Sequence, residues 1–200
     1  MANEMRTYVT VKSDEPRVAK RLQEIFKSRK DTYEVDAIDV INNLEGTSYC
    51  FKSEKEDFNI EIDFPSSQVW DSIIGPKWMH VEYDHSELPE DCNLVLSSAW
   101  SVPIPFLVRL RDELQKIDED CYLKGTYEDE SYDPCGAFVY GEFEYDDMED
   151  TEEVYDWDES DEDDFYNERW SDSLLGLETD LEIAYIEYLE DRKKNPQDYE

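Results

Sequence analysis

The carboxylates of residues 142–168 are the side chains with the clearest chemical potential in this sequence. Sixteen of these 27 residues are Asp or Glu and none is Lys or Arg, so nothing within the segment neutralises them. Carboxylates accept hydrogen bonds from the Arg and Lys side chains that otherwise bind phosphate. The segment therefore predicts a contact surface for a basic protein. The partner-binding residues that we expect are Asp146, Asp147, Glu149, Asp150, Glu152, Glu153, Tyr155, Asp156, Trp157, Asp158, Glu159, Asp161, Glu162, Asp163 and Asp164.

The spacing of these charges indicates what the segment would have to do to imitate a nucleic acid. Duplex DNA carries one phosphate per about 1.7 Å of axis. As a helix the segment would carry one carboxylate per about 2.5 Å, and as an extended chain one per about 5 to 6 Å. Only a compact segment, helped by acidic residues 128–130 and Asp133, approaches that density. Mimicry of phosphate charge therefore requires the acidic segment to be ordered and compact.

Other interpretations of the acidic segment stand beside mimicry. Charged runs are commonly solvated faces, and a mixture of acidic and aromatic residues is also typical of a disordered segment that folds onto a partner groove. A calcium loop is a third possibility, because oxygen-bearing side chains alternate as in an EF-hand at Asp156, Asp158, Ser160, Glu162 and Asp164. Asp161 stands where that loop needs glycine and Asn167 where it needs glutamate, so we expect no specific metal site.

Catalytic and cofactor motifs are not recognisable. No pair of carboxylates can be singled out for acid and base work among 54, and no P-loop or GxGxxG is present. The histidines, His80 and His85, suggest no triad and are expected to be ordinary surface or core residues. The four cysteines are separated by 42, 29 and 14 residues without a CxxC pair, which predicts reduced thiols. We expect neither enzymatic activity nor a cofactor.

The overall charge limits the classes of partner. The chain of 200 residues has a formal net charge of −35, yet 14% of its residues are aromatic, so we expect it to fold. Nucleic acids and anionic membranes would repel it, whereas basic protein surfaces would attract it. The N-terminus has no apolar signal core, and no stretch reaches the roughly 20 apolar residues of a membrane helix. A cytoplasmic protein of undetermined oligomeric state is expected.

The elements that must position the acidic segment begin with an N-terminal α+β subdomain, residues 1–64. A strand is predicted at residues 6–11, and Ser13 or Asp14 is expected to cap a helix with Pro16 in its first turn. The polar face of that helix is the basic patch of the chain, interpreted as a counterweight to the acidic half: Arg17, Lys20, Arg21, Lys27, Arg29 and Lys30. A second helix at 36–44 should stop at Gly46, followed by a hairpin of residues 47–52 and 58–63.

A second group of elements is expected over residues 65–145. Periodicity predicts strands at 79–84, 93–99, 121–127 and 137–145 and a helix at 103–118. Segregated strands and helices indicate an α+β fold. Trp70, Trp78 and Trp100 lie near turns and strand ends, and we expect them in the core.

The third segment, residues 146–200, combines the acidic run with a helix. Ser171 or Asp172 is expected to cap this helix, which should extend to about Lys194, with three cations in its last turn where they favour the helix dipole. Its predicted apolar face comprises Leu174, Leu177, Leu181, Ala184, Tyr185 and Tyr188. The acidic run would thus be tethered at both ends.

The runs SSAWSVPIPFLVRLRDEL, YLKGTYEDE and GAFVYGEFEY, with GPKW at residues 75–78 upstream, resemble the YubB ferredoxin-like family of plasmid and phage proteins. The resemblance covers about residues 74–145. It implies a ferredoxin-like antiparallel sheet with helices on one face and brings no catalytic residues. Val102 stands where the family commonly has proline, and the continuation after Tyr145 is outside the family pattern.

The sequence leads to two hypotheses on function. In the first, the protein is a non-catalytic inhibitor that mimics nucleic-acid phosphate charge and blocks a DNA- or RNA-binding host or anti-phage defence protein. The resemblance to phage and plasmid proteins suggests restriction enzymes, CRISPR effectors or other defence nucleases in a bacterial cell as targets. In the second, it is an acidic adaptor or chaperone-like module that binds a basic protein without blocking nucleic acid.

Overall fold

Strands and helices alternate along the chain in a computed structural model, which describes residues 3–27, 34–48, 50–51, 62–63, 67–76, 79–83, 92–130, 135–141, 152–154 and 169–198. The strands are β1 (Glu4–Lys12), β2 (Glu34–Asp36), β3 (Cys50–Phe51), β4 (Ile62–Asp63), β5 (Met79–Tyr83), β6 (Cys92–Ala99), β7 (Tyr122–Asp129), β8 (Cys135–Tyr140) and β9 (Glu152–Val154). The helices are α1 (Pro16–Ile25), α2 (Ala37–Glu45), α3 (Ser67–Ile73), α4 (Ile104–Gln115), α6 (Arg169–Lys194) and the 3₁₀ helix η3 (Pro196–Asp198).

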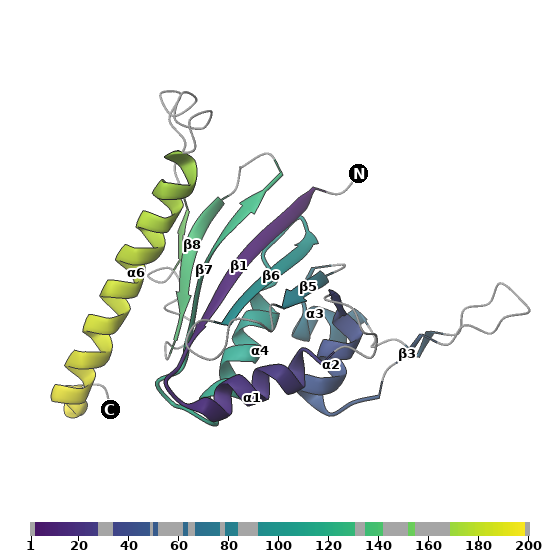
Figure 1. Ribbon diagram of the computed structural model, residues 1–200, viewed down its shortest axis with the longest axis horizontal. Coiled ribbons are helices and arrows are strands. Elements are labelled where there is room, and N and C mark those ends of the chain that lie inside the picture. Colours follow the sequence, from purple (N-terminus) through teal and green to yellow (C-terminus); the bar gives the residue numbers. More distant parts are fainter. Residues whose placement is uncertain are drawn as a thin grey trace, which may run out of the picture.

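The main sheet has seven strands in the order β2-β5-β6-β1-β7-β8-β9, and every neighbouring pair is antiparallel. Strands β3 and β4 pair separately as a two-stranded hairpin, as predicted. Helices and an antiparallel sheet make the protein α+β, which confirms the expected class (Figure 1).

Strand β1 lies in the middle of the sheet, hydrogen-bonded to β6 on one side and β7 on the other. Strands β1 and β2 of residues 1–64 therefore belong to the same sheet as β5 to β8, whereas β3 and β4 form the separate hairpin. Helix α4 leads from β6 to β7 across β1, and the longer connection from β1 to β5, which spans β6, also contains the edge strand β2.

Alternation in β1 explains how the sheet buries one face. Met5, Val9 and Val11 are at most 3% exposed, whereas Arg6 and Tyr8 between them are exposed, as the period of two in a strand requires. The buried side packs against α1 and α4, where the rings of Phe26 and Phe106 meet edge to face with centroids 6.3 Å apart.

The ends of two helices depend on single residues. Glu15, and not Ser13 or Asp14 as predicted, is the N-cap of α1, because its side chain accepts a hydrogen bond from the Arg17 backbone. Ser13 instead accepts from the Glu15 backbone with its hydroxyl. Gly46 follows α2 with φ of 68°, the left-handed conformation that ends helices and favours glycine. Strand β2 and helix α3 were not predicted.

Both faces of β8 are buried, because the two sides of the sheet carry different helices. Phe138 and Tyr140 belong to the face that α4 covers, and Val139 lies on the opposite face with Gly141 beyond the strand end. Helix α6 covers that opposite face over β7 and β8 (Figure 1). Residues 142–145, the end of the strand predicted at 137–145, lie outside the described residues.

Candidate protein-interaction surface

The acidic segment, residues 142–168, is attached to the sheet through β9. This strand pairs with β8 so that Glu152 lies opposite Phe138 and Glu153 opposite Ala137. Two of the predicted partner-binding residues are thus placed on the edge strand of the main sheet. The others lie outside the described residues: Asp146, Asp147, Glu149, Asp150, Tyr155, Asp156, Trp157, Asp158, Glu159, Asp161, Glu162, Asp163 and Asp164.

The described chain ends that flank residues 155–168 are fixed at one end of the sheet. Val154 lies opposite Gly136, near the start of β8, and α6 begins beside the same end (Figure 1). Glu128 pairs with Cys135 in the neighbouring strand, so the end of β7 lies there too. Residues 155–168, the C-terminal half of the acidic segment, are therefore flanked by described elements at two neighbouring places.

The acidic residues at the end of β7 differ in their surroundings. Asp129 is only 4% exposed and accepts a hydrogen bond from the Asn3 amide at 3.4 Å, so its side chain is not displayed. Glu128 accepts a hydrogen bond from the Tyr8 hydroxyl at 3.2 Å, and Glu130 is exposed. Of the three predicted helpers described here, Glu130 is the one fully available to a partner, and Asp133 lies outside the described residues.

Helix α6 is held on the sheet by a tyrosine seated on a glycine. Tyr185 is 2% exposed, and a Cβ added to Gly141 would come within 2.0 Å of its ring. The ring also lies against Tyr122 with centroids 5.0 Å apart. Burial raises the pKa of Tyr185 above its usual range, so the phenol stays neutral. The close approach requires a residue without a side chain at position 141.

Lys124 joins two carboxylates of α6 to strand β7. Its ammonium lies 2.8 Å from Glu182 and 3.7 Å from Glu178, and the Tyr122 hydroxyl donates to Glu182 at 2.8 Å. Burial alone would raise the pKa of Glu182, but the hydrogen bonds from Lys124 and Tyr122 outweigh it and lower the pKa. Burial raises the pKa of Glu178, with Lys124 only partly opposing it. Neither carboxylate is therefore free to bind a partner.

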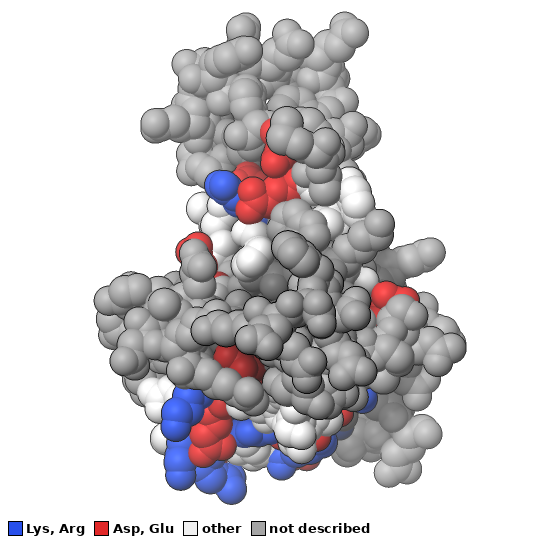
Figure 2. Space-filling model, turned by 90° about the vertical axis from the view of Figure 1, so that its right-hand side faces the viewer, with Lys and Arg blue, Asp and Glu red and all other residues white. Residues whose placement is uncertain are grey.

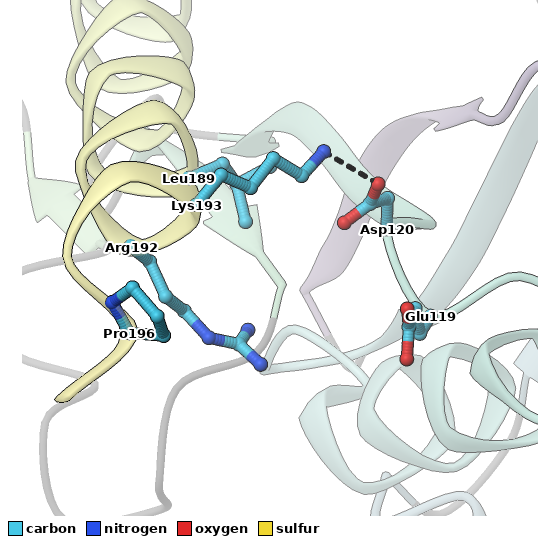
Figure 3. A pocket seen from close by; sticks show the side chains of 6 residues that line it. All are labelled: Glu119, Asp120, Leu189, Arg192, Lys193 and Pro196. Carbon is cyan, nitrogen blue, oxygen red and sulfur yellow. Dashed lines mark hydrogen bonds and ion pairs between the residues drawn. The ribbon is translucent and has the colours of Figure 1, made fainter. Parts of the chain in front are cut away.

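The C-terminal end of α6 is held across a cavity of about 210 Å³ by an ion pair between Lys193 and Asp120, 2.7 Å apart (Figure 3). A second, larger cavity of about 710 Å³ lies where β1 leads into α1. Ser13 donates to Asp118 at 2.5 Å in its wall. Both cavities are lined by acidic and basic side chains together, and their lining residues hold no nucleophile next to a histidine base.

The basic patch of α1 is partly neutralised by acidic residues beside α1 and on α4. Arg17 pairs with Glu15 at 2.9 Å, and Arg21 pairs with Glu113 of α4 at 2.8 Å. The counterweight for these two arginines is therefore local and does not come from the acidic segment. Figure 2 shows Lys and Arg side chains gathered at the lower end of the molecule, where α1 lies in Figure 1.

Two aromatic side chains are displayed to solvent in the described part of the chain. Trp100 is 52% exposed and Tyr8 is 39% exposed, so the prediction that Trp100 lies in the core is wrong. Trp100 has φ of 64°, a conformation in which its side chain cannot follow the β6 register inward. Trp70 is buried at 8% and donates to the Pro76 carbonyl, as predicted for a core residue, and Trp78 lies outside the described residues.

Thiols and histidines give no metal site in the described part. Cys121 and Cys135 are buried and form no disulfide. His80 is exposed on β5 and His85 lies outside the described residues. Within the described ranges no three His, Cys, Asp or Glu residues are grouped so as to hold a metal ion. None of the described helices is both long and apolar enough to cross a membrane.

Besides the edge strand β9, which was not predicted, sequence reasoning missed two features of this surface. The first is the exposed face of α6, where Leu175, Ile183 and Ile186 are 41 to 53% exposed; leucines and isoleucines in a helix signal burial, and only the placement of α6 shows which of them remain outside. The second is the exposure of Trp100. Comparison of the chain with protein-family models, curated proteins and solved structures finds no match.

Proposed function

We propose that this protein is a non-catalytic acidic inhibitor that imitates nucleic-acid phosphate charge and occupies the basic cleft of a DNA- or RNA-binding protein. The observation that carries the proposal is the pairing of β9 with β8. It fixes the acidic segment near its middle, between the end of β8 and the start of α6. Carboxylates that are already anchored lose less entropy on binding than those of a free tail.

The total charge supports the same proposal. A net charge of −35 on 200 residues attracts a basic cleft over distances of about 8 to 10 Å at moderate salt and accelerates encounter. Arginines and lysines of such a cleft, which normally meet phosphate, would donate hydrogen bonds to Asp and Glu. Candidate targets are restriction enzymes, CRISPR effectors and other defence nucleases of a bacterial cell, and the protein would act in the cytoplasm of that cell.

We also infer a ferredoxin-like core. Strands β5, β6, β1 and β7 are neighbours in that order, and each of the two helical connections passes over one strand, which is the split βαβ arrangement. Residues 74–145, which resemble the YubB ferredoxin-like family, would supply β5, β6 and β7 of this core, and β1 would come from outside the resemblance. In this proposal β8, β9 and α6 are additions that carry the acidic segment.

The experiment is capture of bacterial lysate proteins on the immobilised full chain at low and high salt. A captured nucleic-acid-binding protein should be released by duplex DNA and by rising salt, because the same cationic groove would bind either polymer. The variant with Asp156, Asp158, Asp161 and Asp163 changed to Asn should capture it at least about tenfold less well and remain folded.

The matched control changes four exposed acidic residues elsewhere to amides: Asp14, Asp71, Glu82 and Glu119. This variant has the same net charge as the first one. If both variants lose capture equally, total charge and not the acidic segment binds the target. If the captured protein retains its oligonucleotide undiminished while bound, the inhibitor proposal is wrong.

The second candidate function is an acidic adaptor for a basic protein, and the exposed aromatics favour it. Trp100 and Tyr8 offer contact area to a protein partner, and tryptophan and tyrosine are common among residues that dominate binding energy. An adaptor that grips through aromatics should hold its partner in the presence of duplex DNA and at high salt. The capture experiment therefore separates the two functions.

A further inference from the structure

The outer face of α6 displays apolar side chains that no described element covers. Leu175 is 53%, Ile183 50% and Ile186 41% exposed. Their spacings of 8 and 11 residues are close to multiples of 3.6, so they share one side of the helix. Together with Thr179 they form a row about 16 Å long, which we call the α6 outer row.

The inner face of α6 accounts for its attachment without these residues. Leu174, Glu178 and Tyr185 are 2 to 8% exposed and face β7 and β8. The outer row is centred roughly 120° around the helix from that inner face, and α6 forms the left-hand margin of the molecule in Figure 1. An α6 needed only to complete the fold would have polar residues there, as an ordinary surface helix does.

Acidic side chains run beside the outer row. Residues 174–191 contain six Asp or Glu, of which Glu178 and Glu182 pair with Lys124 and Glu190 pairs with Lys194. Asp180 and Glu187, seven residues apart and both exposed, lie along one flank of the row. A matching surface must therefore combine apolar contacts with positive charge.

We propose that the α6 outer row binds a basic amphipathic helix of a partner protein. The partner helix would pack its apolar stripe on Leu175, Ile183 and Ile186 and place Lys or Arg beside Asp180 and Glu187, in the helix-to-helix mode of recognition. A second copy of this chain is the wrong occupant, because two molecules of charge −35 repel each other. An anionic membrane is disfavoured for the same reason.

This inference goes beyond the proposed function and does not depend on it. The α6 outer row begins after the acidic segment ends, and it presents a different chemistry, apolar contact with flanking charge. A protein whose acidic segment failed to displace nucleic acid would still carry this surface. Conversely, the loss of helix binding would leave the inhibitor proposal standing.

The test uses the full chain and a labelled synthetic peptide of about 18 residues built from Leu and Lys, with leucines at helical spacing. Its binding is followed by fluorescence anisotropy at about 0.15 M salt. A scrambled peptide of identical composition, which has the same charge and no apolar stripe, should bind at least about tenfold more weakly. Equal binding of the two peptides would reduce the interaction to charge and overturn the proposal.

Variants locate the binding face. Ile183→Ser with Ile186→Ser should weaken binding of the amphipathic peptide about tenfold, whereas Ala184→Ser, exposed on the same helix but off the row, should leave it unchanged. The double change Asp180→Lys with Glu187→Lys reverses the charge beside the row. It should weaken binding of the amphipathic peptide and reduce the dependence of that binding on salt. All these positions are exposed, and circular dichroism checks that the helix persists. Unchanged affinity in the double serine variant contradicts the proposal.

Two further measurements address other occupants. Sedimentation of the free protein should show a monomer at all concentrations. A dimer that forms as concentration rises, and that is lost in the double serine variant, would make a second copy the occupant and overturn the proposal. Vesicles containing anionic lipid should not retain the chain. Retention by the wild type that is lost in the double serine variant would make a membrane the occupant and overturn the proposal. The four-Asn variant of the acidic segment should keep peptide affinity within about threefold, which separates this surface from the proposed inhibitory one.

Discussion

Glu178 and Glu182, one turn apart on α6, share the ammonium of Lys124 but differ in their ionisation. The Lys124 ammonium lies closer to Glu182, which also accepts from the Tyr122 hydroxyl. Hydrogen bonds to a charged form favour it, and burial disfavours it. The pKa of Glu182 is therefore lowered and that of Glu178 raised. A residue-level consequence is that the two carboxylates contribute to stability with opposite sign at neutral pH.

Substitution of these two residues by glutamine tests that difference. Glu182→Gln should lower the free energy of unfolding at pH 7 by about 1 to 2 kcal/mol, because charge-assisted hydrogen bonds are lost. Its wild-type contribution is present above the ordinary carboxyl pKa of about 4.3 and disappears as pH falls through the lowered pKa. Urea unfolding should thus give a large difference in the free energy of unfolding between the variant and wild type at pH 7 and a small difference at pH 3.

Glu178→Gln should have the opposite effect. The raised pKa of Glu178 means that its charged form is disfavoured in the folded state, so the wild-type cost develops as pH rises from about 4.3 through the raised pKa. Removal of the charge should increase the free energy of unfolding at pH 7 by up to about 1 kcal/mol and change little at pH 3. Destabilisation at pH 7 equal to that of Glu182→Gln would contradict this assignment.

Two glycines allow a second comparison at the scale of single residues. Gly46 has φ of 68°, and nothing lies within 4 Å of a Cβ added there, so Gly46→Ala meets only backbone strain and should cost about 1 kcal/mol. Gly176 lies inside α6, also with open space around it. Gly176→Ala should therefore stabilise the protein by about 0.5 to 1 kcal/mol. Thermal unfolding measures both, and shifts of the same sign would contradict the reasoning.

At the scale of elements, the attachment of α6 decides what the C-terminal part can display. The helix lies on the face of β7 and β8 that α1 to α4 leave uncovered, with Tyr185 against Gly141 near its middle and Lys193 against Asp120 near its end. This attachment turns one side of α6 outward and fixes the point at which the acidic segment returns to the fold. The edge strand β9 fixes a second point.

Gly141→Ala tests the attachment. Its Cβ would come within 2.0 Å of the buried Tyr185 ring, so the helix must shift, and the variant should lose about 1 to 3 kcal/mol of stability. Hydrogen exchange should accelerate in α6 more than in β1. Combination with Tyr185→Ala should cost much less than the sum of the two single changes, because the clash is removed. Additive effects would show that the glycine matters for another reason.

At the scale of the whole molecule, charge repulsion opposes the compact state. A net charge of −35 destabilises folding through self-repulsion, and salt screens it as the Debye length falls from about 30 Å at 0.01 M to about 3 Å at 1 M. The folded state tolerates this repulsion because its hydrophobic core is large and continuous over both helical connections. The surplus charge is therefore available for an external partner.

The melting temperature should accordingly rise with sodium chloride between about 0.01 and 0.5 M. The variant with Asp156, Asp158, Asp161 and Asp163 changed to Asn should melt higher than wild type at low salt and depend less on salt, because four repelling charges are removed. A melting temperature that falls as salt is added would mean that ion pairs such as Arg21 with Glu113 outweigh the general repulsion.

Local pattern was sufficient to predict most elements and their class. The alternation of β1 and the apolar stripes of α1 and α4 are periodic over enough residues to identify strands and helices, and Gly46 marked a helix end by its backbone freedom. The short elements β2 and α3 escaped because a few residues carry too little periodicity. Composition alone also determined the excess of negative charge.

Tertiary structure alone decided where these elements meet. That β1 enters the centre of the sheet, that α6 takes the second face of β8, and that Trp100 and the α6 outer row stay exposed depend on contacts between residues distant in the chain. An apolar side chain has the same local signature whether it faces a core or a partner. Burial is a property of the assembled chain, so sequence periodicity can show that a face is apolar but not which surface covers it.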